Sequence, residues 1–214
     1  MKEKIRAGLA QASSYYDNEI FRESGFENPA SFKKNVVQML LKHEPTLRGK
    51  KLLDVACGNG NFLECAELFF ETCGIDFSRN AIALARQRCK KSKLYVSSAE
   101  NLKFPSGSFD AITCLGSLEH FVDMHASLRE MKRVLKKKGI AVIHVPNSAY
   151  LIHKILNVRE HGQINERMAT EKEWAEILSK YFRVERCYKY NTRFYLRWIP
   201  KRWCCHFTFV CRKS

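Results

Sequence analysis

The sequence has 214 residues, of which 45% are hydrophobic and 28% charged, an ordinary globular composition that suits one domain with a sizeable core. It has no run of about 18 apolar residues and no apolar signal-type segment near its start, so we expect a soluble, cytoplasmic protein without a membrane-spanning helix. The formal net charge of +15 could attract nucleic acid or an acidic substrate, although most of these side chains are expected simply to solvate helix faces.

The first 45 residues are predicted to form helices ahead of a nucleotide-binding core. Residues 5–12 can form a short helix, Gly25 and Pro29 mark a break, and residues 32–43 carry one apolar face at helical spacing. Tyr15 and Tyr16 either pack between these helices or reach a pocket, and of the two Tyr16 has the better position to do so.

The stretch Lys51–Leu63, KLLDVACGNGNFL, reads as a buried strand, a tight loop and the start of a helix. Small residues alternate through the loop, at Ala56, Gly58 and Gly60, and would allow close approach to a ligand. Asp76 ends the next predicted strand, roughly 20 residues after the first, where an acid can bind the two hydroxyls of a ribose. Together these features indicate the nucleotide-binding corner of an α/β fold.

The remaining elements alternate between strand and helix. The predicted ranges are helix 61–70, strand 72–75, helix 79–91, strand 94–97, strand 109–115, a helix around 128–135, strand 140–145, a helix from 171, and strands 182–190 and 206–212. Lys136–Lys138 are expected to cap a helix C-terminus, and Thr170 with Glu173 forms a capping box. The last two strands lack a helix between them and should be antiparallel.

Three motifs in order carry a resemblance to a known family: DVACGNG at 54–60, GIDFS at 74–78, and SSAENLKFPSGSFDAITCLGSLEHF at 97–121. With them the chain resembles class I S-adenosylmethionine-dependent methyltransferases, most of all the small-molecule branch called type 11, over about residues 45–147. Two departures are that Ala56 replaces the usual first glycine and that Ser98 stands where many members carry an acid near the adenine.

The resemblance implies an α/β fold, a Rossmann-like, doubly wound sheet of seven strands, mostly parallel with an antiparallel last strand and with helices on both faces. One methyltransferase domain would span 1–214, with an N-terminal helical cap at 1–45, a cofactor-binding core at 46–147, and a variable acceptor region with a C-terminal hairpin at 148–214. In this family the N-terminal segment covers the cofactor.

The implied cofactor is S-adenosylmethionine, with S-adenosylhomocysteine as the product. Loop 56–60 would lie against the methionine part, Asp76 would hold the ribose, and Phe77 would pack on the adenine. The residues expected to bind the cofactor are Asp54, Ala56, Cys57, Gly58, Gly60, Asp76, Phe77, Ser98, Ala99, Glu100, Leu115 and Gly116. No metal is expected: the nine cysteines are scattered without a C-x-x-C pair and suit reduced, mostly buried thiols.

The main candidate for a catalytic residue at the acceptor is His120, which lies just beyond the strand at 109–115. A histidine with a pKa near 6.5 suits the removal of a proton from an acceptor hydroxyl, although helix packing would also explain this residue. Tyr16, Glu119 and His161 are further candidates for contact with the acceptor. An N-P-P-Y signature of nucleic-acid amino methyltransferases is absent.

We therefore expect a methyltransferase acting on a hydroxyl or amine of a small molecule, anionic if the positive charge is used to bind it, in a monomer or homodimer. The first alternative is an RNA methyltransferase, favoured only by the charge and by the basic, aromatic stretch 193–203, which could equally be a hairpin loop. The second is a cofactor-binding regulator without catalysis. Nucleic acid is the less favoured partner.

Overall fold

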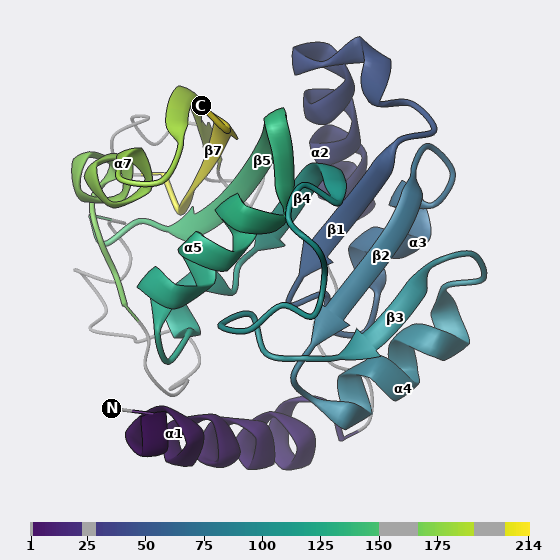
Figure 1. Ribbon diagram of the computed structural model, residues 1–214, viewed down its shortest axis with the longest axis vertical. Coiled ribbons are helices and arrows are strands. Elements are labelled where there is room, and N and C mark those ends of the chain that lie inside the picture. The colour runs from purple at the N-terminus through teal and green to yellow at the C-terminus, as the bar shows by residue number, and fades with distance from the viewer. Residues whose placement is uncertain (1, 23–28, 150–166, 191–203) are drawn as a thin grey trace.

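The computed structural model describes residues 2–22, 29–149, 167–190 and 204–214 of the chain (Figure 1). Within these ranges seven strands form one sheet in the order β3-β2-β1-β4-β5-β7-β6. The strands are β1 (Lys51–Val55), β2 (Glu71–Asp76), β3 (Lys93–Val96), β4 (Phe109–Leu115), β5 (Leu135–Pro146), β6 (Arg183–Tyr190) and β7 (His206–Arg212). β1 to β5 pair in parallel, whereas β7 is antiparallel to both β5 and β6. The predicted fold class is confirmed.

Helices cover both faces of this sheet because its central strands are apolar on both sides (Figure 1). One face packs against α2 (Ala30–His43), α3 (Asn61–Ala66) and α4 (Arg79–Arg88). The other packs against α5 (Met124–Val134) and α7 (Glu171–Ser179), where Trp174 is fully buried and its indole Nε1 donates to the Pro146 carbonyl at 2.9 Å.

The N-terminal helix α1 (Lys2–Tyr15) lies beyond the edge at which β1 and β2 end (Figure 1). It is longer than the predicted 5–12 and continues into a π-helix, η1 (Tyr16–Ile20). A Cβ on Gly8 would stand 3.1 Å from the Val122 side chain, so α1 approaches closely there. Asp17 anchors η1, since its carboxylate accepts from the Ser78 hydroxyl at 2.5 Å and the Asn80 amide at 3.2 Å.

Local capping signals were mostly reliable. Ser78 caps α4 and accepts from the Ala81 amide at 2.9 Å, and Thr170 with Glu173 forms the predicted capping box. The prediction that Lys136–Lys138 cap a helix was wrong, because α5 ends at Val134 and the lysines belong to β5. The cation at that helix end is instead Lys213, whose Nζ donates to the Leu135 carbonyl at 2.6 Å.

Two short 3-10 helices, η2 (Pro45–Leu47) and η3 (Leu118–His120), complete the described elements. None of the helices in the described ranges has the length and apolar character needed to cross a bilayer. All nine cysteines belong to described residues and are free thiols. Among the residues with a described position, no cluster of three or more histidine, cysteine or acidic side chains could hold a metal ion.

Candidate functional site

The loop after β1 turns by using left-handed backbone at three positions. Ala56, Gly58 and Gly60 have φ values of 59°, 54° and 76°. Glycine adopts this conformation without strain, whereas an L side chain such as that of Ala56 costs free energy there. The amide of Cys57 donates to the Ile75 carbonyl at 2.8 Å, which ties the loop to the end of β2.

The glycine at position 60 serves packing. A Cβ there would lie 2.7 Å from the Cys89 Sγ and 3.1 Å from the Ala85 Cβ, so a side chain would collide with α4 and the residue that follows it. At Gly58 a Cβ would make ordinary contact, 3.4 Å from the Phe21 ring. Gly60 therefore brings the loop close to α4, as the third glycine of a nucleotide-binding corner does.

Asp76 lies at the tip of β2 and holds the loop in place. Its Oδ2 accepts from the Gly58 amide and its Oδ1 from the Ser78 amide, each at 2.9 Å. Burial raises the pKa of this carboxyl to about 6, while the hydrogen bonds from Ser78 and Gly58 oppose the rise. At neutral pH Asp76 is therefore mostly ionised and keeps lone pairs for further hydrogen bonds, such as those of a diol.

Asp54 lies under the loop, away from the cavity. It is 3% exposed and accepts a hydrogen bond from the Thr113 hydroxyl at 2.7 Å. Burial raises its pKa to about 7, the Thr113 bond opposes this, and the charge of Asp76 adds to the rise. Asp54 thus joins β1 to β4.

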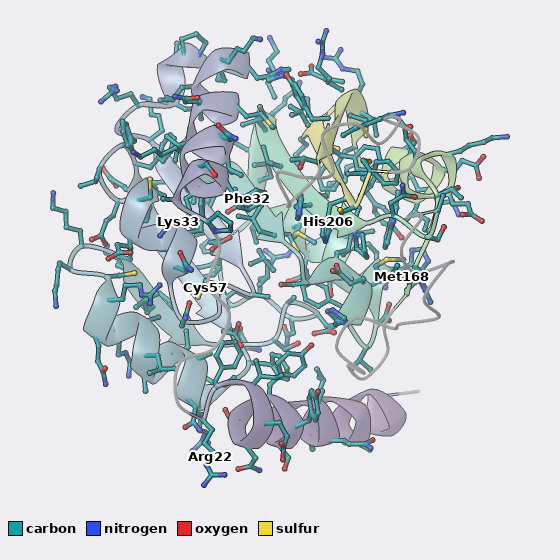
Figure 2. The ribbon with its side chains drawn as sticks, turned by 180° about the vertical axis from the view of Figure 1, so that it is seen from behind. Arg22, Phe32, Lys33, Cys57, Met168 and His206 are labelled. Atoms are coloured by element: carbon teal, nitrogen blue, oxygen red, sulfur yellow. The ribbon has the colours of Figure 1, made fainter. Side chains whose placement is uncertain are left out.

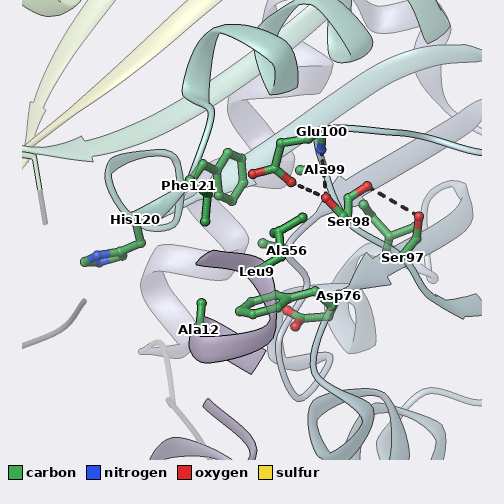
Figure 3. A pocket seen from close by; sticks show the side chains of 13 residues that line it. Leu9, Ala12, Ala56, Asp76, Ser97, Ser98, Ala99, Glu100, His120 and Phe121 are labelled. Carbon is green, nitrogen blue, oxygen red and sulfur yellow. Dashed lines mark hydrogen bonds between the residues drawn. The ribbon is translucent and has the colours of Figure 1, made fainter. Parts of the chain in front are cut away.

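A cavity of about 350 Å³, partly open to solvent, lies between this edge of the sheet and α1 (Figure 3). Four strand ends or loops and one helix contribute to its wall. The lining residues are Leu9, Ala12, Ala56, Ile75, Asp76, Phe77, Ser97, Ser98, Ala99, Glu100, His120, Phe121 and Val122.

Polar groups gather on one side of the cavity, after β3. The Ser98 hydroxyl is hydrogen-bonded to the Glu100 carboxylate and accepts from the Glu100 amide at 3.1 Å. The Ser97 hydroxyl donates to the Ser98 carbonyl at 3.4 Å (Figure 3). The Glu100 carboxylate and the Ser98 hydroxyl thus lie in the same wall of the cavity.

This donor set fits the adenosine half of S-adenosylmethionine. An ionised carboxylate at the end of β2 can accept from two ribose hydroxyls. The apolar faces of Phe77 and Ala99 can enclose a planar base, and Glu100 can accept from an amino group at its edge.

His120 and Glu119 lie at the end of η3. His120 is one of the lining residues, and in Figure 3 its imidazole points away from Asp76 and Ser97. The Glu119 carboxylate is 7% exposed, and its Oε1 lies 3.8 Å from the His120 Nε2. The backbone carbonyl of Glu119 accepts from the Arg167 amide at 3.0 Å, which connects η3 to the segment before α7.

The other predicted residues that have a described position are not part of the cavity lining. The Tyr16 ring meets the Phe77 ring edge-on at 5.4 Å and therefore supports the cavity wall from behind. Cys57 is buried under the loop. Leu115 and Gly116 end β4, and a Cβ on Gly116 would find no atom within 4 Å, so open space adjoins it. His161 lies outside the described residues.

Sequence reasoning missed part of the lining: Leu9 and Ala12 of α1, Ile75 and Ser97 beside the strand ends, and the pair Phe121–Val122. Leu9 and Ala12 stand three residues apart on one side of a helix, and Phe121–Val122 is an apolar pair between His120 and the N-cap Asp123. Both patterns also occur in ordinary cores, so neither marks a cavity without the fold.

Comparison with known proteins agrees with this geometry. Residues 53–143 match the family described as a methyltransferase domain. The demethylmenaquinone methyltransferase of Thermotoga maritima is 36% identical over 121 residues, which cover 55% of this chain and 51% of that protein. The protein of the same name from Staphylococcus carnosus is 27% identical over 192 residues, covering 82% and 77%. The chain thus spans about half the length of the Thermotoga relative.

Solved structures show the same fold at low identity. The PH0226 protein of Pyrococcus horikoshii OT3 superposes with a TM-score of 0.71 at 20% identity, covering 94% of this chain and 99% of that one. The geranyl diphosphate C-methyltransferase of Streptomyces coelicolor A3(2) gives a TM-score of 0.72 at 13% identity, covering 97% and 98%. These likenesses extend the shared fold beyond residues 53–143.

Proposed function

We propose that the chain is a class I S-adenosylmethionine-dependent methyltransferase that binds S-adenosylmethionine in the cavity beneath α1 and transfers a methyl group to a small molecule, a proposal supported by the match of residues 53–143 to the methyltransferase domain. The observation that carries this proposal is the position of Asp76 at the tip of β2, where it lines one cavity together with Phe77, Ala99 and Glu100. The match to the methyltransferase domain supports the reaction type, and the position of the Asp76 carboxylate in the cavity wall supports this cavity as the binding site.

The chain's own residues would bind and orient. Asp76 would accept from the ribose hydroxyls while keeping Gly58 and Ser78 in place. Phe77, supported from behind by Tyr16, would pack on the base. The loop from Ala56 to Gly60 would follow the methionine part, and Leu115 with Gly116 would border the sulfonium. When bound, the cofactor supplies an activated methyl group, so alignment and water exclusion account for much of the remaining catalysis.

For the acceptor we propose a hydroxylated small molecule, and a reduced quinone is the first candidate to try. Both relatives compared above are named demethylmenaquinone methyltransferases, and a quinol offers a hydroxyl of the kind expected from the sequence. His120, one of the lining residues, would take the hydroxyl proton, which raises the electron density of the oxygen and of the neighbouring ring carbons. A hydroxyl or amine of another compound remains the alternative acceptor.

The test is transfer of labelled methyl from S-adenosylmethionine to a set of acceptors. The set comprises a singly prenylated 1,4-naphthohydroquinone kept reduced, 1-naphthol, a primary amine and bulk RNA. We expect label in the first compound and none in RNA. His120→Gln should lower turnover by about 10²–10⁴-fold with cofactor affinity nearly unchanged. Label in RNA alone would replace this proposal by the nucleic-acid alternative, and cofactor binding without label in any acceptor would favour a regulator.

A further inference from the structure

Two histidines stack where β5 ends and β7 begins. The rings of His144 and His206 are 4.8 Å apart with an interplanar angle of 21°. His144 lies opposite Leu115 in β4 and opposite Thr208 in β7, while His206 pairs with Pro146 of β5. Since β5 is parallel to β4, this stack lies at the same edge of the sheet as the cavity.

His144 forms the fixed half of the stack. It is 6% exposed, its Nδ1 lies 2.8 Å from the Thr208 hydroxyl, and the Phe32 ring meets it edge-on at 4.8 Å. Burial lowers the pKa of His144 well below its usual value, and His206 lowers it further. His144 is therefore a neutral ring held on three sides, with no freedom to reach a ligand.

His206 is the less buried half of the stack. It is only partly buried, and Figure 2 shows it with Phe32 on the face of the sheet that α2 covers. A stacked neutral neighbour restricts the ring of His206, so its hydrogen-bonding direction is fixed before any ligand arrives. An imidazole in this position can donate to, or accept from, a hydroxyl or a carbonyl oxygen.

A backbone hydrogen bond connects this stack to the end of β4. The backbone amide of Gly116 donates to the carbonyl of His144 at 2.9 Å, and Gly116 is exposed with no atom within 4 Å of the place of a Cβ. The chain then runs through Ser117 into η3, which carries His120. Gly116 and Ser117 thus lie between His144, which is bonded to Gly116 across the sheet, and His120, which follows them along the chain.

We propose that the acceptor lies over Gly116, between His120 and His206. His206, positioned by its stack on His144, would contact a second polar group of the acceptor. This rests on the proposed function, because the acceptor is the molecule that receives the methyl group. A 1,4-dihydroxylated ring carries its oxygens on opposite sides, so His120 would engage one and His206 the other. His206 would then select two-oxygen rings over rings with one.

The group transfer balances without any further reactant. The acceptor gives an electron pair to the methyl carbon, the carbon–sulfur bond breaks with its electron pair on sulfur, and the proton displaced from the acceptor passes to a base and then to water. His206 makes and loses no bond in this step. Its contribution is to binding and selection.

The experiment compares His206→Ala and His206→Gln with the wild type on two acceptors, the singly prenylated 1,4-naphthohydroquinone and its counterpart with one hydroxyl. His125→Gln is the matched control, because that imidazole lies 2.9 Å from the Tyr181 hydroxyl on the other face of the sheet. Cofactor affinity and the melting temperature of each variant are measured first, to separate folding from selection.

For the two-hydroxyl acceptor we expect His206→Ala to raise KM by about 10- to 100-fold, the range for one lost hydrogen bond to a buried hydroxyl. The one-hydroxyl acceptor should change by less than about twofold, His206→Gln should recover part of the loss, and His125→Gln should behave as the wild type. Equal effects on both acceptors, or no effect on either, would overturn the proposal.

A second measurement does not need catalysis. The oxidised quinone, which cannot be methylated, is titrated into the protein while the imidazole carbon–proton resonances are followed by NMR, with the His206 signal assigned from His206→Gln. A selective shift of the His206 resonance supports the proposal, and an unmoved His206 signal at saturation contradicts it. If the wild type methylates nothing, the proposed function fails while this titration still decides the binding site.

Discussion

Gly60→Ala tests how the nucleotide-binding loop is held against α4. The new methyl group would lie 2.7 Å from the Cys89 Sγ and 3.1 Å from the Ala85 Cβ, closer than such atoms approach one another. Overpacking of this kind costs about 1–3 kcal/mol. The φ of 76° adds about 1–2 kcal/mol to this destabilisation, because alanine is strained in left-handed backbone. Alanine also restricts the unfolded chain, which offsets about 0.4–1 kcal/mol. The free energy of unfolding should fall by about 2–4 kcal/mol.

Gly49→Ala separates the cost of the methyl group's collision from the cost of the left-handed backbone. Gly49 has a φ of 74°, yet a Cβ there would meet nothing within 4 Å, so only the backbone cost remains. Urea denaturation at constant slope gives both free energies, and Gly60→Ala should be less stable than Gly49→Ala by about 1–3 kcal/mol.

A rescue variant strengthens this comparison. Adding Cys89→Ala to Gly60→Ala removes the nearest atom and should recover part of the loss, because the Ala85 backbone still lies 3.2 Å from the new methyl group. Equal losses in the two glycine variants, with no coupling to Cys89, would refute the reasoning that Gly60 is required for packing.

Two further predictions concern groups around the site. Asp54 has a raised pKa of about 7, so its stabilising effect is fully present below its unfolded value near 4 and is lost as the pH rises through 7. The free energy of unfolding of the wild type should therefore fall between pH 5 and pH 8 relative to Asp54→Asn, and parallel pH profiles would contradict this. The Arg133 guanidinium donates to the carbonyls of Leu102 and Phe104 at 2.8 and 2.7 Å and pairs with Glu130. Arg133→Lys should therefore lower the free energy of unfolding, measured by urea denaturation, by about 1–3 kcal/mol. A loss below about 0.5 kcal/mol would show that these guanidinium contacts are dispensable.

Much of the fold follows from local signals. The apolar run Leu52–Val55, the small-residue loop and Asp76 each report on a few consecutive residues, and the structure has the strand, the turn and the acid where these signals place them. The cap at Ser78 is likewise a short-range hydrogen bond that residue type alone predicts. Features whose cause lies within one turn or one strand are the ones that sequence reasoning recovers.

Other features depend on contacts across the fold. Lys136–Lys138 favour a helix end by composition, but β5 begins at Leu135, which pairs with Phe109 of β4. Nothing in the residues around Leu9 indicates that α1 crosses the edge of the sheet, because that placement depends on the close approach at Gly8 and the anchor at Asp17. The contribution of Leu9 and Ala12 to the cavity lining therefore could not be predicted from the sequence.

The site was only partly predictable for the same reason. From its position in DVACGNG, Asp54 is expected to orient the loop or to contact the cofactor, and nothing in that motif indicates its hydrogen bond to Thr113 of β4. His206 gave no signal at all, because its neighbour His144 is 62 residues earlier in the chain.

The central claim, that the cavity binds S-adenosylmethionine through Asp76, is tested most directly by calorimetry with S-adenosylhomocysteine. The account predicts one site per chain, no competing site for NADH, and a loss of about 1–3 kcal/mol in Asp76→Ala, the range for removing a partner of buried hydroxyls. Asp76→Asn, which keeps one acceptor for the Gly58 amide, controls for the loop and should lose less. Unchanged affinity in both variants, with the loop still folded, would contradict the account.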